Sequence, residues 1–479
     1  MGKTNLSRRN FLRQFSVLTA AAAAAPSLLN ADTILTETKA ARKISANDKV
    51  NLACIGIGNR GEQIIRAFVK TGMCNIVALC DTDMGAKHTE KIINMFPNVP
   101  RFKKCRDMFD KMASSIDAVC IGTPDHSHFP ATMLAMSLGK HVYVEKPLAH
   151  SFDEIELLMA AEKKYNVVTQ MGNQGHSEAN YFQFKTWKEA GIIKNVRSVT
   201  AHMNNPRRWH KWDPNMQSYP SAQPVPTTLD WKEWLSGERF HEYNKDYING
   251  QWRCWYDFGM GALGDWGAHI LDTIHEFLEL GLPTEINMLR ADGHNPFFFP
   301  FSSTIQFRFP KRKDMPAMDI TWYDGLNNLP EIPKGYGKVE LDPNIPTTNV
   351  GSVKPSKLNP GKIIYTDDLI FKGGSHGSTL SIIPEEKAMD IKSKLPEVPE
   401  SPSNHFENFL LACKGLEKPR SPFSISGPLS QVFCLGVIAQ QLNARLKFDP
   451  KLKMFTNNPL ANVLLHREVS REGWSDLYI

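Results

Sequence analysis

The sequence predicts an α/β protein with a parallel sheet in its N-terminal part and antiparallel strands in its C-terminal part. Two observations lead to this expectation. Between residues 50 and 171, short apolar runs alternate with segments of helical periodicity, as strands and crossover helices do in a parallel sheet. After residue 284, polar and apolar residues alternate singly, as in strands with one solvated face.

The first 31 residues predict a removable export signal. Residues 7–13 read SRRNFLR, a twin-arginine motif, and a short apolar run ending in alanines follows at 17–25. Roughly a dozen apolar residues are too few to span a bilayer, so no integral membrane segment is expected after processing. The sequence thus predicts a signal peptide at 1–31, a linker at 32–48, and a periplasmic location reached through the twin-arginine translocation machinery. The alternative is a basic, disordered N-terminus.

Composition is that of an ordinary globular protein. The chain has 479 residues, of which 42% are hydrophobic and 22% charged, and this length suits two domains. The formal net charge is +6, and the leader contributes four of its basic residues, so little charge remains after processing. Nucleic acid is therefore not an expected partner. Three of the eight cysteines, Cys54, Cys80 and Cys120, lie in apolar runs and are expected to be free, whereas Cys254, Cys413 and Cys434 stay undecided.

A glycine motif follows the first predicted strand, at 50–55. In Gly56-x-Gly58-x-x-Gly61 the first glycine permits a tight turn, the second lets the backbone approach a pyrophosphate, and the third allows close helix packing. Asn59 and Arg60 lie inside this motif and are candidate contacts for the same ligand. The sequence therefore predicts a dinucleotide-binding turn.

A carboxylate ends the next apolar run, at 76–80. Asp81 lies twenty residues after Gly61, where it would accept hydrogen bonds from ribose hydroxyls and repel a 2′-phosphate. NAD is thus favoured over NADP. The alternative is an aspartate that only caps a turn, and the nearby Asp83 could share or take the role.

Polar residues also follow the predicted strands at 116–121 and 141–144. Ligands of open parallel sheets bind beyond the carboxyl ends of the strands, so these residues are expected to face the nicotinamide half of the cofactor. A capping box at Ser151 and Glu154 then predicts a helix, and a strand at 167–171 completes a domain at 49–175. The candidate cofactor contacts at these strand ends are Thr123, Pro124, His128, Glu145 and Lys146.

These motifs, together with the later Asp265-Trp-Gly-Ala-His269, occur in the order and spacing of the Gfo/Idh/MocA family of glucose-fructose oxidoreductase and inositol dehydrogenase. The resemblance covers nearly all of the chain after the leader. It implies a Rossmann NAD-binding domain at 49–175 and an α/β domain at 176–479, whose open, mainly antiparallel sheet supports substrate binding and homo-oligomerisation. It also implies that Lys146 contacts the nicotinamide ribose and the substrate, Asp265 holds the substrate, and His269 is the general base.

The chemistry of these residues agrees with that role. Asp265 and His269 are four residues apart and so share one face of a helix. Oxidation of a secondary alcohol needs a base near the hydroxyl, and an ordinary histidine pKa of about 6.5 suits this near neutral pH. The structural alternative makes His269 a core histidine and Asp265 a helix cap. A metal alternative lacks a third ligand, so no metal is expected.

The candidate substrate region is rich in tryptophan. Six of the ten tryptophans lie between residues 209 and 255, in a proline-rich insertion predicted at 205–258. Flat aromatic faces suit the CH face of a sugar, although about half of these rings are expected only to anchor the insertion. The candidate substrate contacts are Arg253, Trp255, Tyr256 and Trp266.

Regular structure is predicted to resume beyond the insertion. Strands are expected at 304–309, 318–322, 363–365 and 369–371, with a proline- and glycine-rich loop at 324–361. Helices are expected at 406–411 and 429–446.

The combined prediction is an exported NAD-dependent oxidoreductase that acts on a secondary hydroxyl of a sugar or glycoside, for which the resemblance suggests ring carbon 3. Free NAD is expected to be scarce outside the cytoplasm, so the cofactor should be tightly bound and recycled on the enzyme. One alternative is an NAD-dependent glycosidase that uses transient oxidation and elimination. The other is a sugar-binding protein without catalysis.

Overall fold

The computed structural model describes residues 41–203, 213–313, 315–325, 327–337, 358–467 and 473–478. The predicted signal peptide at 1–31, the first part of the linker and the first residues of the tryptophan-rich insertion lie outside these ranges.

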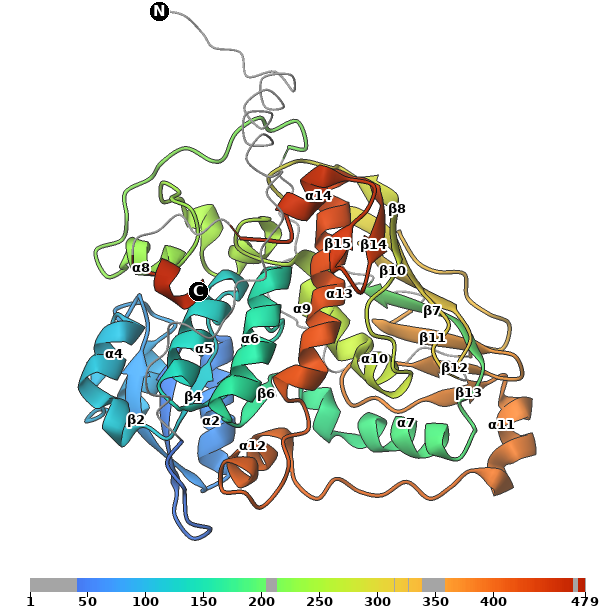
Figure 1. Cartoon of the computed structure of the whole chain (residues 1–479), viewed down its shortest axis with the longest axis horizontal. Coiled ribbons are helices and arrows are strands. Elements are labelled where there is room, and N and C mark those ends of the chain that lie inside the picture. The colour runs from blue at the N-terminus through green and yellow to red at the C-terminus, as the bar shows by residue number, and fades with distance from the viewer. Residues whose placement is uncertain are drawn as a thin grey trace, which may run out of the picture. The chain divides into compact units, whose positions relative to one another are not determined.

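The first domain is built on a six-stranded parallel sheet in the order β3-β2-β1-β4-β5-β6 (Figure 1). This order confirms the predicted Rossmann topology. The strands are β1 (Val50–Ile55), β2 (Cys74–Cys80), β3 (Arg101–Phe102), β4 (Ala118–Ile121), β5 (His141–Val144) and β6 (Thr169–Met171). The helices are α2 (Arg60–Lys70), α3 (Glu90–Met95), α4 (Cys105–Met112), α5 (His128–Ser137) and α6 (Phe152–Tyr165).

Local signals in the sequence explain where these elements begin. All four residues of β4 and of β5 are buried, as expected of central strands covered on both faces. Helix α6 starts at the predicted capping box, in which Ser151 and Glu154 each satisfy a backbone group of the other.

The second domain contains a nine-stranded mixed sheet in the order β13-β12-β11-β7-β10-β9-β8-β14-β15. Only β7 and β10 pair in parallel, so the sheet is mainly antiparallel, as predicted. Its strands are β7 (Val196–Met203), β8 (Glu285–Asp292), β9 (Ser302–Phe309), β10 (Met318–Asp324), β11 (Gly361–Thr366), β12 (Ile370–Gly373), β13 (Ser381–Ile383), β14 (Arg445–Asp449) and β15 (Met454–Phe455). Its helices are α7 (Ala179–Glu189), α8 (Trp231–Leu235), α9 (Gly261–Ile270), α10 (Asp272–Phe277), α11 (Glu385–Ile391), α12 (His405–Cys413), α13 (Phe423–Leu442) and α14 (Pro459–Val463).

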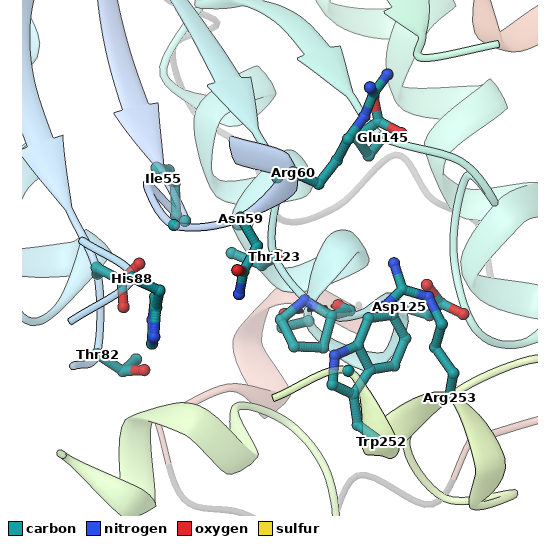
Figure 2. Close-up of a pocket in the computed structure, with 18 of the residues that line it drawn as sticks. Ile55, Asn59, Arg60, Thr82, His88, Thr123, Asp125, Glu145, Trp252 and Arg253 are labelled. Atoms are coloured by element: carbon teal, nitrogen blue, oxygen red, sulfur yellow. Dashed lines mark hydrogen bonds and ion pairs between the residues drawn. The ribbon is translucent and has the colours of Figure 1, made fainter. Parts of the chain in front are cut away.

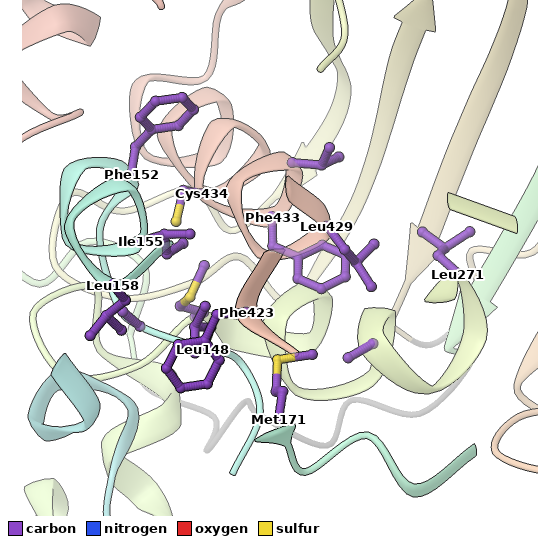
Figure 3. Packing of buried hydrophobic residues seen from close by; sticks show 14 of the residues in the cluster. Leu148, Phe152, Ile155, Leu158, Met171, Leu271, Phe423, Leu429, Phe433 and Cys434 are labelled. Atoms are coloured by element: carbon purple, nitrogen blue, oxygen red, sulfur yellow. The ribbon is translucent and has the colours of Figure 1, made fainter. Parts of the chain in front are cut away.

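Helix α13 joins the two domains through one core. Its Phe423, Phe433 and Cys434 lie among apolar side chains of α6 and of the neighbouring strands (Figure 3). Among the described residues it is the one helix long and apolar enough to cross a membrane, but 78% of that stretch is buried inside the protein. Helix α13 is therefore accounted for as a core helix.

The end of this helix differs from the prediction. The sequence pattern predicted a helix at 429–446, whereas α13 begins earlier and ends at Leu442. Asn443 adopts the left-handed conformation at φ 45°, which stops the helix, and β14 then pairs with β8. Leu446 and Phe448 are both buried on one face of β14, and this two-residue repeat is the strand signal that the helical pattern obscured.

Two later segments of the chain return to the first domain. The ring of Phe409 in α12 lies 5.9 Å from that of Phe68 in α2, and the ring of Tyr478 lies 4.4 Å from that of Phe129 in α5. The first domain is therefore completed by residues that follow the second domain in sequence.

The insertion folds around its own aromatic core. Trp231 and Trp234 stack at 4.7 Å between ring centroids, and Trp255 packs against Tyr247 at 5.2 Å. Trp209 and Trp212 lie outside the described residues. All eight cysteines are buried and form no disulfide, including Cys254, Cys413 and Cys434.

Candidate functional site

A cavity of about 1370 Å³ runs between the two domains and the insertion. Figure 2 shows Asn59 and Thr123 on one side of it and Trp252 and Arg253 on another. Thirteen of the residues predicted for the site line this cavity, and they are Gly56, Gly58, Asn59, Arg60, Asp81, Thr123, Pro124, Glu145, Lys146, Arg253, Asp265, Trp266 and His269.

The glycine turn has the geometry that a bound pyrophosphate requires. Gly56 has φ +76°, a conformation that favours glycine, and a Cβ on Gly61 would lie 1.9 Å from the carbonyl oxygen of Gly56. Helix α2 begins at Arg60 directly beside the cavity, and the side chain of Asn59 makes no capping hydrogen bond there. The N-terminus of α2 can therefore hold an anion with its backbone N–H groups.

Asp81 is tied to this turn. One carboxylate oxygen accepts a hydrogen bond from the Ile57 N–H at 2.9 Å, and the other accepts one from the Asp83 N–H at 3.0 Å. Burial raises the pKa of Asp81, and these two hydrogen bonds oppose that rise. The carboxylate thus fixes the turn and retains lone pairs that can accept ribose hydroxyls.

Glu145 and Arg60 form an ion pair at the edge of the cavity. Nε and one terminal nitrogen of Arg60 donate to the same oxygen of Glu145, at 3.1 and 3.0 Å, and Gln174 donates to it at 3.2 Å. Burial raises the pKa of Glu145, but Arg60 and Lys146 outweigh this effect, and the pKa lies below its ordinary value. Glu145 is therefore charged, and its ion pair holds the guanidinium of Arg60 at the edge of the cavity.

Lys146 and Asp265 bring the two domains together at the centre of the site. The ammonium of Lys146 donates to a carboxylate oxygen of Asp265 at 2.8 Å and to its carbonyl oxygen at 2.7 Å. An ammonium has three N–H donors, so one remains for a ligand. Burial lowers the pKa of Lys146, although Asp265 opposes this.

His269 lies one helical turn beyond Asp265 on α9 and is 7% exposed. Burial lowers the pKa of His269 well below its ordinary value, and the neighbouring His376 and Lys146 lower it further. The imidazole is therefore neutral at physiological pH, which is the form that accepts a proton. Nδ1 is buried and has no hydrogen-bond partner among the described residues.

Arg253 and Trp252 form the wall contributed by the insertion. The guanidinium of Arg253 lies 4.0 Å from the centre of the Trp252 ring, and its Nε lies 3.4 Å from the carboxylate of Asp265. Arg253 thus lies between the Trp252 ring and Asp265, the residue that holds Lys146.

Four predicted residues do not line the cavity: Gly61 packs against Gly56 within the glycine turn, and the other three lie elsewhere. Trp255 is fully buried in the aromatic core of the insertion, and its indole N–H donates to the carbonyl oxygen of Asp246 at 2.8 Å. Tyr256 is 5% exposed and does not line the cavity. The ring nitrogens of His128 face the carbonyl oxygens of Pro147 at 2.7 Å and Thr123 at 2.9 Å, so this histidine supports the cavity wall from behind.

Other cavity residues escaped the sequence analysis. Asp125 follows the predicted Thr123 and Pro124, and its carboxylate accepts the backbone N–H of Met260 at 3.1 Å. His376 lies in the loop between β12 and β13 and stacks on His269. The sequence signal for His376 was its place in the Gly-Gly-Ser-His-Gly-Ser run of 373–378. Among these glycines and serines it is the one residue with an imidazole side chain.

Both domains match models of one protein family. Residues 50–173 match the model of the Gfo/Idh/MocA oxidoreductase family that describes its NAD-binding Rossmann fold. Residues 185–293 match the model of the same family's C-terminal alpha/beta domain.

Curated relatives share part of this chain. Glycosyl hydrolase family 109 protein 2 of Shewanella sp. (strain ANA-3) is 32% identical over 173 residues, which cover 33% of this chain and 38% of that protein. The glycosyl hydrolase family 109 protein of Saccharopolyspora erythraea is 29% identical over 286 residues, which cover 58% of this chain and 53% of that protein. The chain thus aligns with between about a third and about a half of the length of the relatives it matches.

Solved structures share the fold over most of the chain. The aldose-aldose oxidoreductase from Caulobacter crescentus superposes with a TM-score of 0.52 at 17% identity, covering 84% of this chain and 100% of that one. The WlbA dehydrogenase from Bordetella pertussis, solved in complex with NADH and UDP-GlcNAcA, superposes with a TM-score of 0.53 at 14% identity, covering 84% and 99%. At these identities the likeness concerns the fold. Residues 50–173 and 185–293 of this chain thus match the two domains of the Gfo/Idh/MocA oxidoreductase family, in the expected order.

Proposed function

We propose that this protein is an NAD-dependent oxidoreductase that oxidises a secondary hydroxyl of a sugar or glycoside. The observation that carries the proposal is the meeting of Lys146, Asp265 and His269 in one cavity with the glycine turn. When bound, the nicotinamide accepts a hydride from carbon and can return it. The chain's own residues must then bind the substrate, orient it and manage the hydroxyl proton.

Each of these tasks has a group in the structure. Asp265 leaves one N–H of Lys146 unused. This N–H can donate a hydrogen bond to the substrate hydroxyl and lower the pKa of that hydroxyl. His269 is held neutral by burial and accepts the hydroxyl proton. Trp252 and Arg253 offer the aromatic face and polar head that suit a sugar ring. The cations of Lys146 and Arg253 face the two carboxyl groups of Asp265 and Asp125, so a neutral sugar fits this wall best.

The cofactor assignment follows from Asp81. A carboxylate beside the glycine turn accepts ribose hydroxyls and repels a 2′-phosphate, so NAD is favoured over NADP. Tight binding is supported by the cover over the cavity. Trp234 of the insertion and Trp474 near the C-terminus both line it, and Trp474 is held under the guanidinium of Arg106 at 4.9 Å.

The twin-arginine sequence at 7–13 supports export to the periplasm. A cofactor that is bound before export and retained would also meet the scarcity of free NAD outside the cytoplasm. The chemistry must then close its own redox cycle. A second carbonyl compound could be reduced in the same site, or the substrate itself could be re-reduced.

The second possibility is a distinct candidate function, an NAD-dependent glycosidase. Oxidation acidifies the neighbouring C–H, the leaving group is eliminated, water adds, and the carbon is reduced again. The names of the curated relatives favour it, because several are glycosyl hydrolase family 109 proteins. Both candidates use the same first step at His269.

The decisive experiment starts with mass spectrometry of cofactor released from the protein purified from its native compartment. Stoichiometric NAD(H) is expected, and a protein with no affinity for NAD would refute the proposal. The loaded protein is then mixed with a panel of glycosides while nicotinamide absorbance and products are followed. Free sugar without net redox change identifies the glycosidase, whereas a stable keto sugar identifies the dehydrogenase.

The base is tested by His269→Asn. Loss of a general base typically slows the step about 10²- to 10⁴-fold, and the variant should keep its bound NAD. His275→Asn is the matched control, because His275 lies on the adjoining α10 but bonds to the carbonyl oxygen of Gly281 at 2.9 Å, away from the cavity lining. If His269→Asn leaves every reaction unchanged, a sugar-binding protein without catalysis becomes the better description.

A further inference from the structure

A second imidazole lies against the proposed base. The rings of His269 and His376 are stacked with centroids 3.9 Å apart and an interplanar angle of 16°. His376 lines the cavity and comes from the loop between β12 and β13, more than a hundred residues after His269 in sequence. Two histidines from separate segments thus share one end of the site.

The loop is held in place from three sides. The N–H of His376 donates to the carbonyl oxygen of His269 at 2.8 Å, and the side-chain amide of Asn180 donates to the carbonyl oxygen of His376 at 3.2 Å. Gly175 lies so close that a Cβ there would be 3.0 Å from the same oxygen. Within this support His376 adopts φ +52°, a conformation that non-glycine residues seldom take and that concentrates at functional sites.

The ring of His376 is also oriented. Its Nδ1 lies 2.8 Å from the hydroxyl oxygen of Ser375, which is fully buried. The edge of Trp266 faces both imidazoles, at 5.6 Å from His376 and 6.2 Å from His269. These contacts hold the imidazole plane of His376 close to parallel with that of His269.

The charged groups around the pair come from four elements. Asp265 lies on α9, Lys146 follows β5, and Arg60 begins α2, and all three act on the charge of His269. Glu178 precedes α7, and its carboxylate lies where a Cβ on Gly377 would be, at 2.0 Å. Two stacked imidazoles repel each other when both are protonated, so at most one of them carries a charge near neutral pH.

We propose that His376 is a second catalytic residue, which accepts the proton from the carbon next to the oxidised carbon while His269 accepts the proton of the hydroxyl. The inference rests on the proposed function and deepens its glycosidase form. Simple alcohol oxidation transfers one proton and needs one base. A cavity that holds two imidazoles side by side suits a reaction that removes protons from two adjacent positions of one sugar ring.

The second step removes a proton and the leaving group from two neighbouring carbons. After oxidation, the C–H beside the new carbonyl loses its proton to His376, and the electron pair of that bond forms a carbon–carbon double bond. The bond from the next carbon to the leaving oxygen breaks, and its electron pair stays on that oxygen, which takes a proton from water. The hydroxide left by that water adds to the carbon that lost the leaving oxygen, and His376 returns its proton to the neighbouring carbon. The hydride then returns to the carbonyl carbon and His269 returns its proton to the carbonyl oxygen, which gives the free sugar without net oxidation.

The test uses the mature, NAD-loaded protein in D₂O with 4-nitrophenyl glycosides of neutral hexoses as probes. Three readouts are followed in the first turnover, namely nicotinamide reduction, nitrophenol release and deuterium incorporation into the released sugar. The main variant is His376→Asn, because asparagine tolerates the left-handed backbone of this position. His202→Asn is the control, since His202 is a buried histidine bonded to the carbonyl oxygen of Asn359 at 2.6 Å and does not line the cavity.

His376→Asn should keep nicotinamide reduction within about tenfold of the unmodified protein and lose nitrophenol release and deuterium incorporation by about 10²- to 10⁴-fold. His269→Asn should lose all three, and His202→Asn none. Equal loss of all three readouts in His376→Asn would show that His376 only supports His269 and would overturn the proposal. Unchanged deuterium incorporation in that variant would overturn it as well.

A second measurement separates this inference from the proposed function. If no glycoside reduces the nicotinamide in the unmodified protein, the proposed function has failed. The histidine pair is then judged by NMR titration of the imidazole protons without substrate. His376→Phe keeps a stacked ring but removes its charge, and it should raise the pKa of His269; an unchanged titration would refute the pairing.

Discussion

The two walls of the cavity bury charge in opposite ways. Behind the wall formed by residues 122–128 of the first domain, the buried guanidinium of Arg467 is bound by Glu154 at 2.9 Å and by Glu238 at 2.7 Å. Behind the wall formed by α9 and His376, the ammonium of Lys362 is fully buried and has no hydrogen-bond partner among the described residues. One wall stabilises its charge by pairing, and the other does not.

The difference shows in the pKa values of the basic groups. Burial alone would lower the pKa of Arg467, but Glu238 and Glu154 raise it well above its ordinary value. Burial lowers the pKa of Lys362 to about 8, and it also lowers that of His269. The first wall is therefore a fixed ionic scaffold, whereas the second favours neutral bases, as proton abstraction requires.

The largest effect is expected from breaking the paired wall. Arg467→Met leaves the carboxylates of Glu154 and Glu238 buried without their cation, which typically destabilises a protein by about 3–5 kcal/mol. The variant should unfold at clearly lower urea concentration. Arg445→Met, at an exposed arginine of β14, is the control and should change little. A loss below about 1 kcal/mol would show that the pairing contributes little to stability.

The opposite change is expected at the unpaired wall. Lys362→Met removes the buried ammonium and keeps a side chain of similar length, so the variant should be more stable than the unmodified protein. A fall in pKa from 10.5 to about 8 corresponds to roughly 3 kcal/mol at the lower pH, since one pKa unit is about 1.4 kcal/mol. Lys447→Met, at an exposed lysine of β14, is the control.

The destabilisation caused by the buried ammonium of Lys362 depends on pH. Below about pH 8 the folded protein must carry a charged Lys362, so the penalty is fully present there. As the pH rises toward 10.5, Lys362 is already neutral in the folded protein while the unfolded chain still binds the proton, so the penalty disappears. The stability difference between Lys362→Met and the unmodified protein should therefore shrink on going from pH 7 to pH 10. A constant difference would contradict the assignment.

The side of the cavity contributed by the first domain could be predicted from sequence, and the side contributed by α9 and His376 only in part. The glycine turn, Asp81 and Lys146 follow predicted strands directly, so their positions depend on local sequence and on the rule that strand ends meet at one edge. The positions of Asp265 and His269 could be predicted because a helix places residues four apart on one face. Between them these signals located the cavity and its central groups.

The remaining contacts depend on long-range packing. His376 reaches His269 only through the position of the β12–β13 loop, which the glycine- and serine-rich run around it does not predict. Trp252 faces the cavity and Trp255 the aromatic core because a 3₁₀ turn at Gln251–Cys254 sets their directions, which a count of tryptophans cannot give. His128 was expected to touch the cofactor, but two carbonyl oxygens behind the wall take both of its ring nitrogens.

The smallest of these effects concerns the cofactor side of the first wall. Asp81→Ala removes the acceptor for the Ile57 and Asp83 N–H groups and the proposed partner of the ribose. Hydrogen bonds to a charged group contribute about 1.5–3 kcal/mol, so NAD affinity should fall about ten- to a hundredfold in calorimetric titration. NADP should be rejected less strongly, because the repulsion of its 2′-phosphate is gone.

Asp83→Ala separates this role from that of a neighbouring carboxylate. Asp83 also lines the cavity, and its buried Oδ1 has no hydrogen-bond partner among the described residues. If Asp81 is the ribose acceptor, Asp83→Ala keeps NAD affinity within a few fold and leaves the preference over NADP intact. If Asp83→Ala instead causes the larger loss, the ribose is held by Asp83, and the role of Asp81 is confined to fixing the glycine turn through the Ile57 N–H.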